Sequence, residues 1–537
     1  MSSPGLPPPS APRRPHVWHR PTGDETDHYA WLADRDDPAT IAYLDSENAW
    51  ADEWFAPAEP LIDELFGEIR SRVKEDDDAV PVRRGAWWYT SRTETGKSYA
   101  IHTRGGRQSG AGDNVLLDEN LEAEGHGYFS LSIFDVSNND NVLAWSSDTD
   151  GSEMYTIRFR RLDTGEQLDD EIADTTWGGS AWSADDRYFF YVVPDDAMRP
   201  WKVMRHEMGT SSTADVCVFE DPDERFFVSV DLSKSKEWII IESGSRTSAE
   251  AWLIPSGDCR AEPTVVRPRA DDIEYSVDHW GDRFIILHNT DAVDFRVDVA
   301  PVSSPGTWEP FIAHSSGSRI TQFETFRDFG VMQRWVNGQQ VLSFVTHDGT
   351  ETAIHVLDEP HEVEIDANPE WESTGVRISY QSLTVPPTVA SVERTSGSVN
   401  MLKRTETPNV ALASYVSVRE WAVAPDGTRV PVDLVRHVDT ALDGTAPCLL
   451  YGYGSYEASM APWFSVARLS LLDRGWVWAL AHPRGGGEMG RDWYLQGKLL
   501  AKRNTFTDTL ACAHHLGAGL VDAGRIGRKS GQGFYRY

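Results

Sequence analysis

Three glycines in the run RGGGEMG have the spacing of a dinucleotide-binding loop. Gly485, Gly487 and Gly490 fit the pattern G-x-G-x-x-G and follow the apolar run WVWALAH. Such a site requires a complete βαβ unit, with an acidic residue about 20 positions further on at the end of a second strand. Asp508 is the candidate, but it lies within NTFTDTLACAHHLGAGL, which has the pattern of a helix. The context therefore argues against nucleotide-dependent oxidoreductase chemistry.

Histidines and cysteines could supply proton transfer or metal ligands. We interpret His482 as a loop residue and the pair His514 and His515 as helix-surface residues, without a catalytic or metal role. The four cysteines are far apart and form no C-x-x-C pair: Cys217, Cys259, Cys448 and Cys512. This pattern is typical of reduced thiols in a cytosolic protein. We expect no metal site and no cofactor.

The composition limits the partners of the chain. Its 537 residues include 50 Lys and Arg against 84 Asp and Glu, a formal net charge of -34. Nucleic acids and anionic membranes are therefore disfavoured, because phosphate binding needs the opposite sign. No stretch approaches the roughly 18 apolar residues of a membrane span. Residues 1–18 contain arginines but no apolar stretch after them, so we predict a proline-rich disordered leader and a cytoplasmic protein.

The elements that position any site change character twice along the chain. Residues 19–80 are expected to be mainly helical, since apolar residues recur at three-to-four spacing and acidic residues come early in each run. In residues 81–405, apolar strands alternate with Asp, Gly, Ser and Asn turns in about seven copies. Copies of this length fit four-stranded blades, so we predict a seven-bladed β-propeller with its tryptophans packed between blades.

Residues 406–520 have the pattern of an α/β domain. A hairpin is expected around Asp426-Gly427. The runs APCLLYGYGS and GWVWALAHPRGGG are nearly continuous apolar segments that end in glycine-rich loops, as buried parallel strands do. A helix follows, with Asn504 or Thr505 placed to cap it.

A propeller followed by such a domain resembles the prolyl oligopeptidase family of serine peptidases, and within it the oligopeptidase B type. The segments that carry the likeness are YAWLADRDDP, DTDGSEMYTIRFRRLDTGE, LYGYGSY, LLDRG and AHPRGGGEMGRDWYLQGKLLAKRNTFTD, and it extends over roughly residues 15–520. The resemblance implies an α/β-hydrolase capped by the propeller, with the N-terminal helical segment packed on the hydrolase domain. It also implies cleavage of short peptides after Arg or Lys by a serine, histidine and aspartate.

One part of that machinery is present in the expected place. Tyr453, in LYGYGSY, matches the tyrosine whose hydroxyl in this family helps to form the oxyanion hole. A phenol can donate a hydrogen bond to the negative charge that develops in acyl transfer. The family usually has Gly after the following Ser-Tyr, whereas Glu457 stands here. We therefore expect the turn to differ locally.

The catalytic triad is not recognisable among the 537 residues. An α/β-hydrolase presents its serine in a G-x-S-x-G elbow, and no serine of this chain has Gly at both the second position before it and the second after it. Ser530 lies between Arg528 and Gln532 at those positions. The family places its aspartate and histidine still later. We expect the hydrolase part to be truncated, the 448–452 strand to be an edge, and the chain to be inactive.

Residues 521–537 differ in character from what precedes them. GRKSGQGFYRY is similar to the C-terminal end of 3-hydroxyacyl-CoA dehydrogenases, so the chain has the pattern of a chimera. Two alternatives to a peptidase follow: a non-catalytic binding protein that uses the propeller, or a chimera related to those dehydrogenases. The tail alone could not supply hydride chemistry, and no segment specifically indicates the binding protein.

Overall fold

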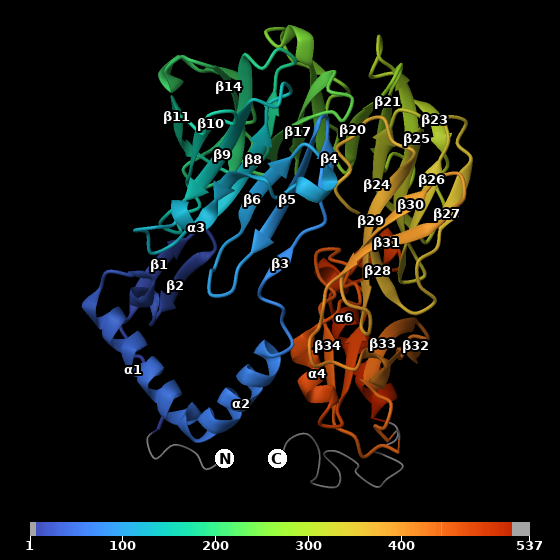
Figure 1. Ribbon diagram of the computed structural model, residues 1–537. Helices are drawn as coiled ribbons and strands as arrows, with labels where there is room; N and C mark the ends of the chain where they lie inside the picture. Colours follow the sequence, from blue (N-terminus) through green and yellow to red (C-terminus); the bar gives the residue numbers. More distant parts are fainter. Residues whose placement is uncertain (1–6, 442, 518–537) are drawn as a thin grey trace. The chain divides into compact units, whose positions relative to one another are not determined.

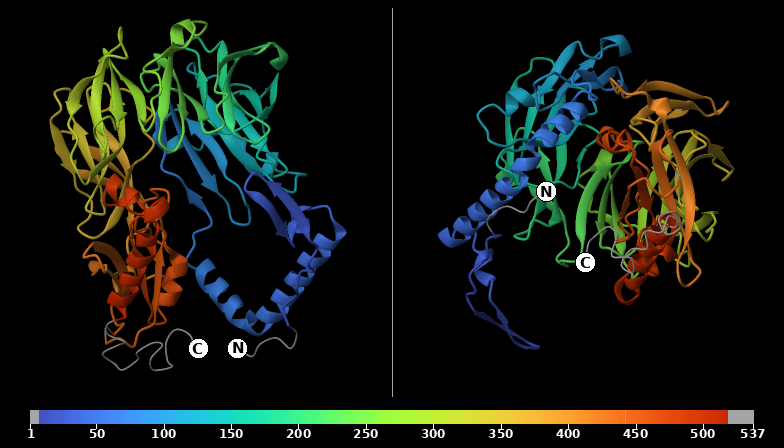
Figure 2. Two further views of the ribbon diagram at one scale, coloured as in Figure 1. Left: turned by 180° about the vertical axis from the view of Figure 1, so that it is seen from behind. Right: turned by 90° about the horizontal axis from the view of Figure 1, so that it is seen from below.

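The computed structural model describes residues 7–441 and 443–517. Its contacts divide the chain into two units, before and after the Val73–Lys74 bond, which we describe separately. The first unit consists of a hairpin and two helices, with bounds as follows: β1 His16–Arg20, β2 Gly23–Asp27, η1 Ala30–Ala33, α1 Pro38–Phe55, η2 Ala56–Ala58 and α2 Glu59–Arg70. Figures 1 and 2 show α1 and α2 diverging from η2.

The helices confirm the prediction for this segment, but the hairpin was not predicted. β1 and β2 pair antiparallel from His16 with Asp27 to Arg20 with Gly23, so ordered structure starts within the predicted leader. The strands were missed because HVWHR and GDETD lack the apolar alternation that marks a strand. Helix α1 starts as its sequence suggests: Asp37 accepts a hydrogen bond from the Ala39 amide, and Pro38 occupies the first turn.

The second unit begins with seven sheets of the predicted propeller, each made of four consecutive antiparallel strands apart from an extra short strand in the first. Blades 1 to 3 contain β3 Asp77–Asp78, β4 Val82–Arg84, β5 Trp87–Thr93, β6 Ile101–Gly105, β7 Asn114–Asp118; β8 Ser130–Val136, β9 Val142–Asp148, β10 Tyr155–Arg161, β11 Gln167–Thr175; β12 Ser180–Trp182, β13 Tyr188–Pro194, β14 Pro200–Glu207 and β15 Val216–Glu220. The short helix α3, Glu119–Glu122, joins the first two blades.

Blades 4 to 7 continue the same order (Figure 1). Their strands are β16 Phe227–Leu232, β17 Trp238–Gly244, β18 Ala249–Pro255, β19 Thr264–Val265; β20 Tyr275–Trp280, β21 Arg283–His288, β22 Arg296–Pro301, β23 Glu309–Ile312; β24 Ser318–Phe326, β25 Phe329–Val336, β26 Gln339–Val345, β27 Glu351–Ile354; β28 His361–Ile365, β29 Gly375–Ser382, β30 Thr388–Glu393 and β31 Val399–Arg404. Every blade is thus a local, sequential unit.

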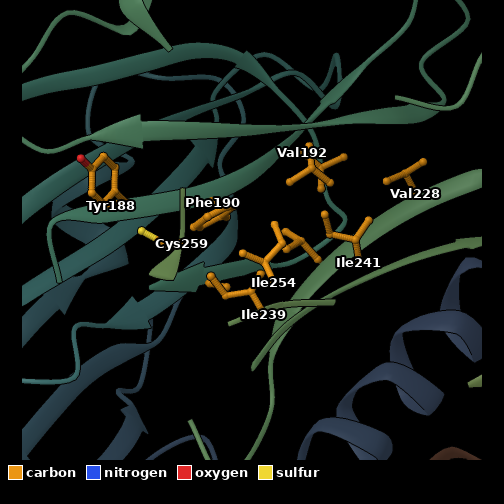
Figure 3. Close-up of a cluster of buried hydrophobic side chains, with 11 residues drawn as sticks. Tyr188, Phe190, Val192, Val228, Ile239, Ile241, Ile254 and Cys259 are labelled. Atoms are coloured by element: carbon orange, nitrogen blue, oxygen red, sulfur yellow. The ribbon is translucent and has the colours of Figure 1, made fainter. Parts of the chain in front are cut away.

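Apolar clusters fill the boundary between each blade and the next along the chain. Between blades 3 and 4, for example, Phe190 and Val192 of β13 meet Ile239 and Ile241 of β17 (Figure 3). Comparable clusters join blades 1 and 2, 2 and 3, 4 and 5, 5 and 6, and 6 and 7. Trp182 and Trp280 are fully buried in two of them, as predicted for the tryptophans. These clusters form the core of the propeller.

The boundary between blade 7 and blade 1 is different. Within residues 7–441 and 443–517, no apolar cluster spans it. Instead, Arg377 of β29 donates to the carbonyls of Val80 and Pro81 at 3.1 Å each. Lys403 of β31 lies 2.7 Å from the Asp77 carboxylate. Polar contacts therefore close the ring, and we call this boundary the seam.

After the propeller, the chain forms a four-stranded sheet in the order β32-β33-β35-β34, with helices on both faces (Figure 1). The elements are η6 Leu412–Ser414, β32 Tyr415–Val423, β33 Arg429–His437, β34 Cys448–Gly452, α4 Val466–Leu472, β35 Val477–Ala481, α5 Arg491–Leu495, η7 Leu499–Ala501 and α6 Arg503–Leu516. The hairpin at Asp426-Gly427 is confirmed, and β34 runs parallel to β35.

One local prediction in this domain is wrong, and another is confirmed. Helix α6 begins at Arg503, before both proposed caps, and the Thr505 hydroxyl instead donates to the Arg484 carbonyl at 2.6 Å. Strand β34 lies at the end of the sheet with Leu449 and Tyr451 exposed, which confirms the predicted edge strand. An apolar run does not by itself distinguish a central strand from an edge strand. No helix in the described part of the chain is long and apolar enough to cross a membrane.

Candidate functional site

Tyr453 directly follows β34, at the end of the strand where the carboxyl ends of β34 and β35 meet. In α/β sheets, ligands bind outside the carboxyl ends of parallel strands. The Tyr453 side chain is 45% exposed, so its hydroxyl can reach a ligand. A phenol can donate one hydrogen bond. The position suits the predicted oxyanion donor, and the role itself stays a prediction.

The loop after Tyr453 has a strained backbone. Gly454, Tyr456 and Glu457 all have positive φ, at 65°, 55° and 60°. For a residue with a side chain this conformation costs about 1–2 kcal/mol. Glu457 therefore adopts a conformation that glycine takes more readily, and the predicted local change of the turn stays a prediction. Its amide donates to the Gly485 carbonyl at 3.0 Å, which helps to hold the turn.

The Glu457 side chain is held from two sides. Its carboxylate accepts from Arg319 Nε of β24 at 3.0 Å and from the guanidinium of Arg491, at the start of α5. Arg491 also pairs with Glu274 of blade 5, and its amide donates to Asp294 Oδ1 at 2.6 Å. No sequence pattern signals this arrangement, because the partners are far apart in the chain.

The glycine-rich loop lies against this turn. A Cβ atom at Gly485 would stand 2.0 Å from the Gly454 carbonyl oxygen, one at Gly487 would stand 2.9 Å from the Glu457 oxygen, and one at Gly490 would stand 2.7 Å from Asp294. The glycines thus permit close backbone packing. The helix that follows, α5, has only five residues. Protein atoms therefore occupy the space beside all three glycines.

His482 lies in a loop, as predicted, and its side chain is buried in an ion-pair cluster that the sequence did not reveal. Its Nε2 is 3.0 Å from Asp433 Oδ2, and its Nδ1 is 3.5 Å from Glu488 Oε1. Arg419 makes a bidentate pair with Asp433 at 2.6 and 2.7 Å. Burial alone would lower the pKa of His482, but the two carboxylates reverse this and raise it to about 9. His482 is therefore an imidazolium at neutral pH.

This buried cluster also supports the Tyr453 loop. Glu488 Oε1 accepts a hydrogen bond from the Met460 amide at 2.9 Å, whereas its Oε2 has no partner among the described residues. The available sequence signal was Asp433, an acidic residue inside the apolar strand PVDLV, since a charge at a core-facing position requires a partner. The partner's identity could not be read from the sequence.

Asp508 has a structural partner too. Both of its oxygens accept from the Arg484 guanidinium, at 2.8 and 2.7 Å, and the Asp508 side chain is fully buried within α6. Hydrogen bonding to Asp508, against the effect of burial, raises the pKa of Arg484. Arg484 also pairs with Asp426 at 2.7 Å. Asp508 therefore anchors α6 to the glycine-rich loop.

The propeller encloses a cavity of about 970 Å³ lined by the first strands of its blades. The charged residues that line it are Arg84, Asp135, Asp231, Lys234, Lys236, Glu242, Asp278 and Glu324. Five of these eight are acidic. Burial raises the pKa of Asp231 to about 6 and that of Glu242 to about 7. The cavity wall thus gains negative charge as the pH rises through neutrality.

The remaining predicted residues lie apart from Tyr453 or outside the described residues. His514 and His515 are exposed on α6, and His515 pairs with Glu420 of β32 at 2.7 Å. All four cysteines are free thiols. Burial raises the pKa of Cys512 to about 12, so its thiolate is not accessible near neutral pH. Ser530 and the tail 521–537 lie outside the described residues.

Comparison with known proteins extends these observations. Residues 9–405 match the prolyl oligopeptidase N-terminal beta-propeller domain, and residues 462–528 match the prolyl oligopeptidase family. Dipeptidyl aminopeptidase BI of Pseudoxanthomonas mexicana is 39% identical, over 95% of this chain and 73% of its own length. Protease 2 of Moraxella lacunata is 33% identical, over 95% and 74%.

Solved structures agree with the sequence relatives. Oligopeptidase B from Leishmania major superposes with a TM-score of 0.90 and 30% identity, over 96% of this chain and 77% of its own. Oligopeptidase B from Trypanosoma brucei, with covalently bound antipain, gives a TM-score of 0.90 and 31% identity over the same shares. With a matching propeller, hydrolase region and relatives over nearly its whole length, the chain belongs to the prolyl oligopeptidase family of serine peptidases.

Proposed function

We propose that this chain is the propeller and the first part of the catalytic domain of an oligopeptidase that acts on short peptides after Arg or Lys. The observation that carries the proposal is Tyr453, exposed at the carboxyl end of the parallel strand β34. A donor there would stabilise the oxyanion of a tetrahedral intermediate. The relatives are peptidases by name, and one solved oligopeptidase B holds antipain covalently.

The preference for basic peptides is supported by charge. The chain carries a formal net charge of -34, and five acidic side chains line the propeller cavity beside three basic ones. Such a field raises the local concentration of cationic ligands and repels anionic ones. The finding of four free thiols is also compatible with a cytoplasmic location, which we propose on that basis.

Binding of peptides tests this part of the proposal directly. Fluorescence anisotropy would compare a labelled octapeptide containing four arginines with the same peptide containing four glutamates. The 537-residue chain should bind the basic peptide at least tenfold more tightly at low salt, and added salt should reduce the difference. Equal affinity for both peptides would contradict the proposed preference.

We further propose that the 537-residue chain does not hydrolyse peptides by itself, because no serine in it has the G-x-S-x-G flanks of a nucleophile elbow. A fluorogenic Arg-Arg substrate should be cleaved no faster than in buffer. A fluorophosphonate probe should leave all serines unlabelled. Cleavage together with a label mapped to Ser530 would show that this part of the proposal is wrong.

A further inference from the structure

The loop that carries Tyr453 is attached to the propeller by charge. Glu457, four residues after Tyr453, accepts hydrogen bonds from Arg319 of blade 6 and from Arg491 of α5. Arg491 in turn reaches Glu274, which precedes β20 of blade 5. A chain of alternating charges therefore connects blade 5, α5, the Tyr453 loop and blade 6.

These contacts are shielded from water. The side chains of Arg319, Glu457 and Arg491 are 13%, 18% and 8% exposed. The Arg319 guanidinium also lies 3.6 Å from the centroid of the Phe295 ring, which covers its face. Partly buried pairs of this kind are screened by salt much less than surface pairs. A movement of blade 6 can therefore change the position of the Tyr453 loop.

Backbone contacts reinforce the same connection. Asp294, which is 1% exposed, accepts from the Arg491 amide with one oxygen and from the Gly317 amide with the other, at 2.6 Å each. The Gly338 amide of blade 6 donates to the Glu488 carbonyl at 3.0 Å. The hydrolase loops are therefore joined to blades 5 and 6 at several points.

Glu457 holds a backbone conformation that its residue type disfavours. Both Tyr456 and Glu457 have left-handed φ values, and glycine would adopt them without strain. The two ion pairs offset that cost only if Arg319 and Arg491 are in place. The turn after Tyr453 thus depends on groups contributed by another part of the fold.

We propose that Glu457 is a positioning residue that couples the orientation of Tyr453 to the docking of propeller blades 5 and 6 on the hydrolase loops. This inference rests on the proposed oxyanion role of Tyr453. While Arg319 and Arg491 hold Glu457, the phenol is fixed at the end of β34. When blades 5 and 6 move away, Glu457 loses Arg319, Arg491 loses Glu274 and Asp294, and the phenol loses its orientation. The propeller would therefore control the orientation of the oxyanion donor.

The test uses the full chain with 3-fluorotyrosine incorporated at position 453 and two measurements. The fluorine resonance reports the surroundings of the phenol, and hydrogen exchange reports residues 453–460 and 314–320 on the two sides of the connection. In Glu457→Gln, the fluorine line should shift or broaden, and exchange should increase at least fivefold in both segments. Glu351→Gln is the matched control, because Glu351 pairs with Arg334 within blade 6. It should change neither measurement.

Two further variants keep the proposal falsifiable. Glu457→Gly removes both ion pairs but adopts the left-handed turn easily, so it should fold even if Glu457→Gln does not, and exchange should still increase in residues 314–320, which lose their partner. The double variant that combines Glu457→Gln with Arg319→Gln should show hydrogen exchange no faster than the single variant that exchanges faster. An unchanged fluorine line, additive effects, or faster exchange confined to residues 453–460 would each overturn the coupling. No step of the test needs hydrolysis, so its failure is distinct from failure of the peptidase proposal.

Discussion

Six blade boundaries of the propeller and the seam between blades 7 and 1 close the same ring in different ways. The six are filled by apolar side chains such as Phe190, Ile239 and Trp280. At the seam, Arg377 and Lys403 contact backbone carbonyls and a carboxylate. Apolar burial stabilises by about 25 cal/mol per Å² and hardly depends on salt. Partly exposed ion pairs contribute roughly 0–1 kcal/mol each and weaken as salt is added.

The difference follows from local sequence. Neighbouring blades contribute long apolar strands to each other, whereas the strands that blade 1 offers first are the two-residue β3, Asp77–Asp78, and β4, Val82–Arg84. Such short polar strands cannot supply an apolar face. One sequential repeat can thus build a ring whose boundaries differ in strength. We expect the seam to be the first boundary to open.

The largest effect is expected inside an apolar boundary. Phe190 is fully buried between blades 3 and 4 (Figure 3), so Phe190→Ala should leave a cavity and lower the free energy of unfolding by about 3–5 kcal/mol. Urea unfolding followed by tryptophan fluorescence measures this. The loss should be equal at 50 mM and 1 M salt. A loss under 1 kcal/mol would show that these clusters do not dominate the ring.

The next effect concerns a buried ion-pair cluster, which should behave differently from the seam. His482→Gln should cost about 3 kcal/mol at pH 7, because it breaks the pairing of a buried charge. The pKa of His482 is raised from 6.5 to about 9, so its stabilising contribution is complete below pH 6.5 and is lost as the pH rises to 9.

The pH dependence supplies the control for His482. The free energy of unfolding of the wild type should fall between pH 6.5 and 9, and this slope should be shallower in His482→Gln. High salt should change the difference in unfolding free energy between the two proteins only little, whereas salt should weaken the contacts at the seam. Parallel pH profiles for the two proteins would contradict the assignment of an imidazolium to His482.

At the seam, Arg377 makes the most buried contacts. Arg377→Gln removes a guanidinium that donates to Val80, Pro81 and Asp366, and we expect a loss of about 2 kcal/mol. Hydrogen exchange should increase in residues 77–93 and 375–393 and remain unchanged across the boundary between blades 3 and 4. An equal increase in hydrogen exchange at both boundaries would contradict the proposed difference between the seam and the apolar boundaries.

The smallest effect is expected at Lys403, whose side chain and that of Asp77 are 26% and 30% exposed. Lys403→Gln should cost about 1 kcal/mol or less in low salt and nothing measurable in 1 M salt. Differential melting at the two salt concentrations measures this. If the loss of stability persists in high salt, the Lys403 contact behaves like a buried ion pair, and the prediction is wrong.

Much of the fold could be predicted from the sequence because its signals are local. Alternating apolar strands with polar turns predicted the seven blades, and Asp426-Gly427 predicted the hairpin between β32 and β33. The hairpin β1–β2 was missed, since its polar strands have no apolar alternation. The cap of α6 was misplaced because the Thr505 hydroxyl has a tertiary partner, the Arg484 carbonyl, that competes with capping.

The candidate site was predictable only where one residue carries the signal. Tyr453 was placed by its motif at the end of an apolar run, and it lies at the end of β34. His482 was correctly placed in a loop, but its burial between Asp433 and Glu488 was not foreseen, because a histidine in a loop has no local mark of burial. Glu457 was recognised only as a departure from the family pattern, and its partners are Arg319, on a strand 138 residues away, and Arg491, in a helix 34 residues away.

The sequence by itself therefore determined the repeat, the family and the position of Tyr453, since backbone hydrogen bonding and hydrophobic periodicity act between residues close in the chain. Only the tertiary structure decided which charges meet. Arg319 reaches Glu457, His482 lies between two carboxylates, and the seam is polar. The physical reason is that ion pairs depend on distance in space, and the strength of each depends on how far the surrounding fold excludes water.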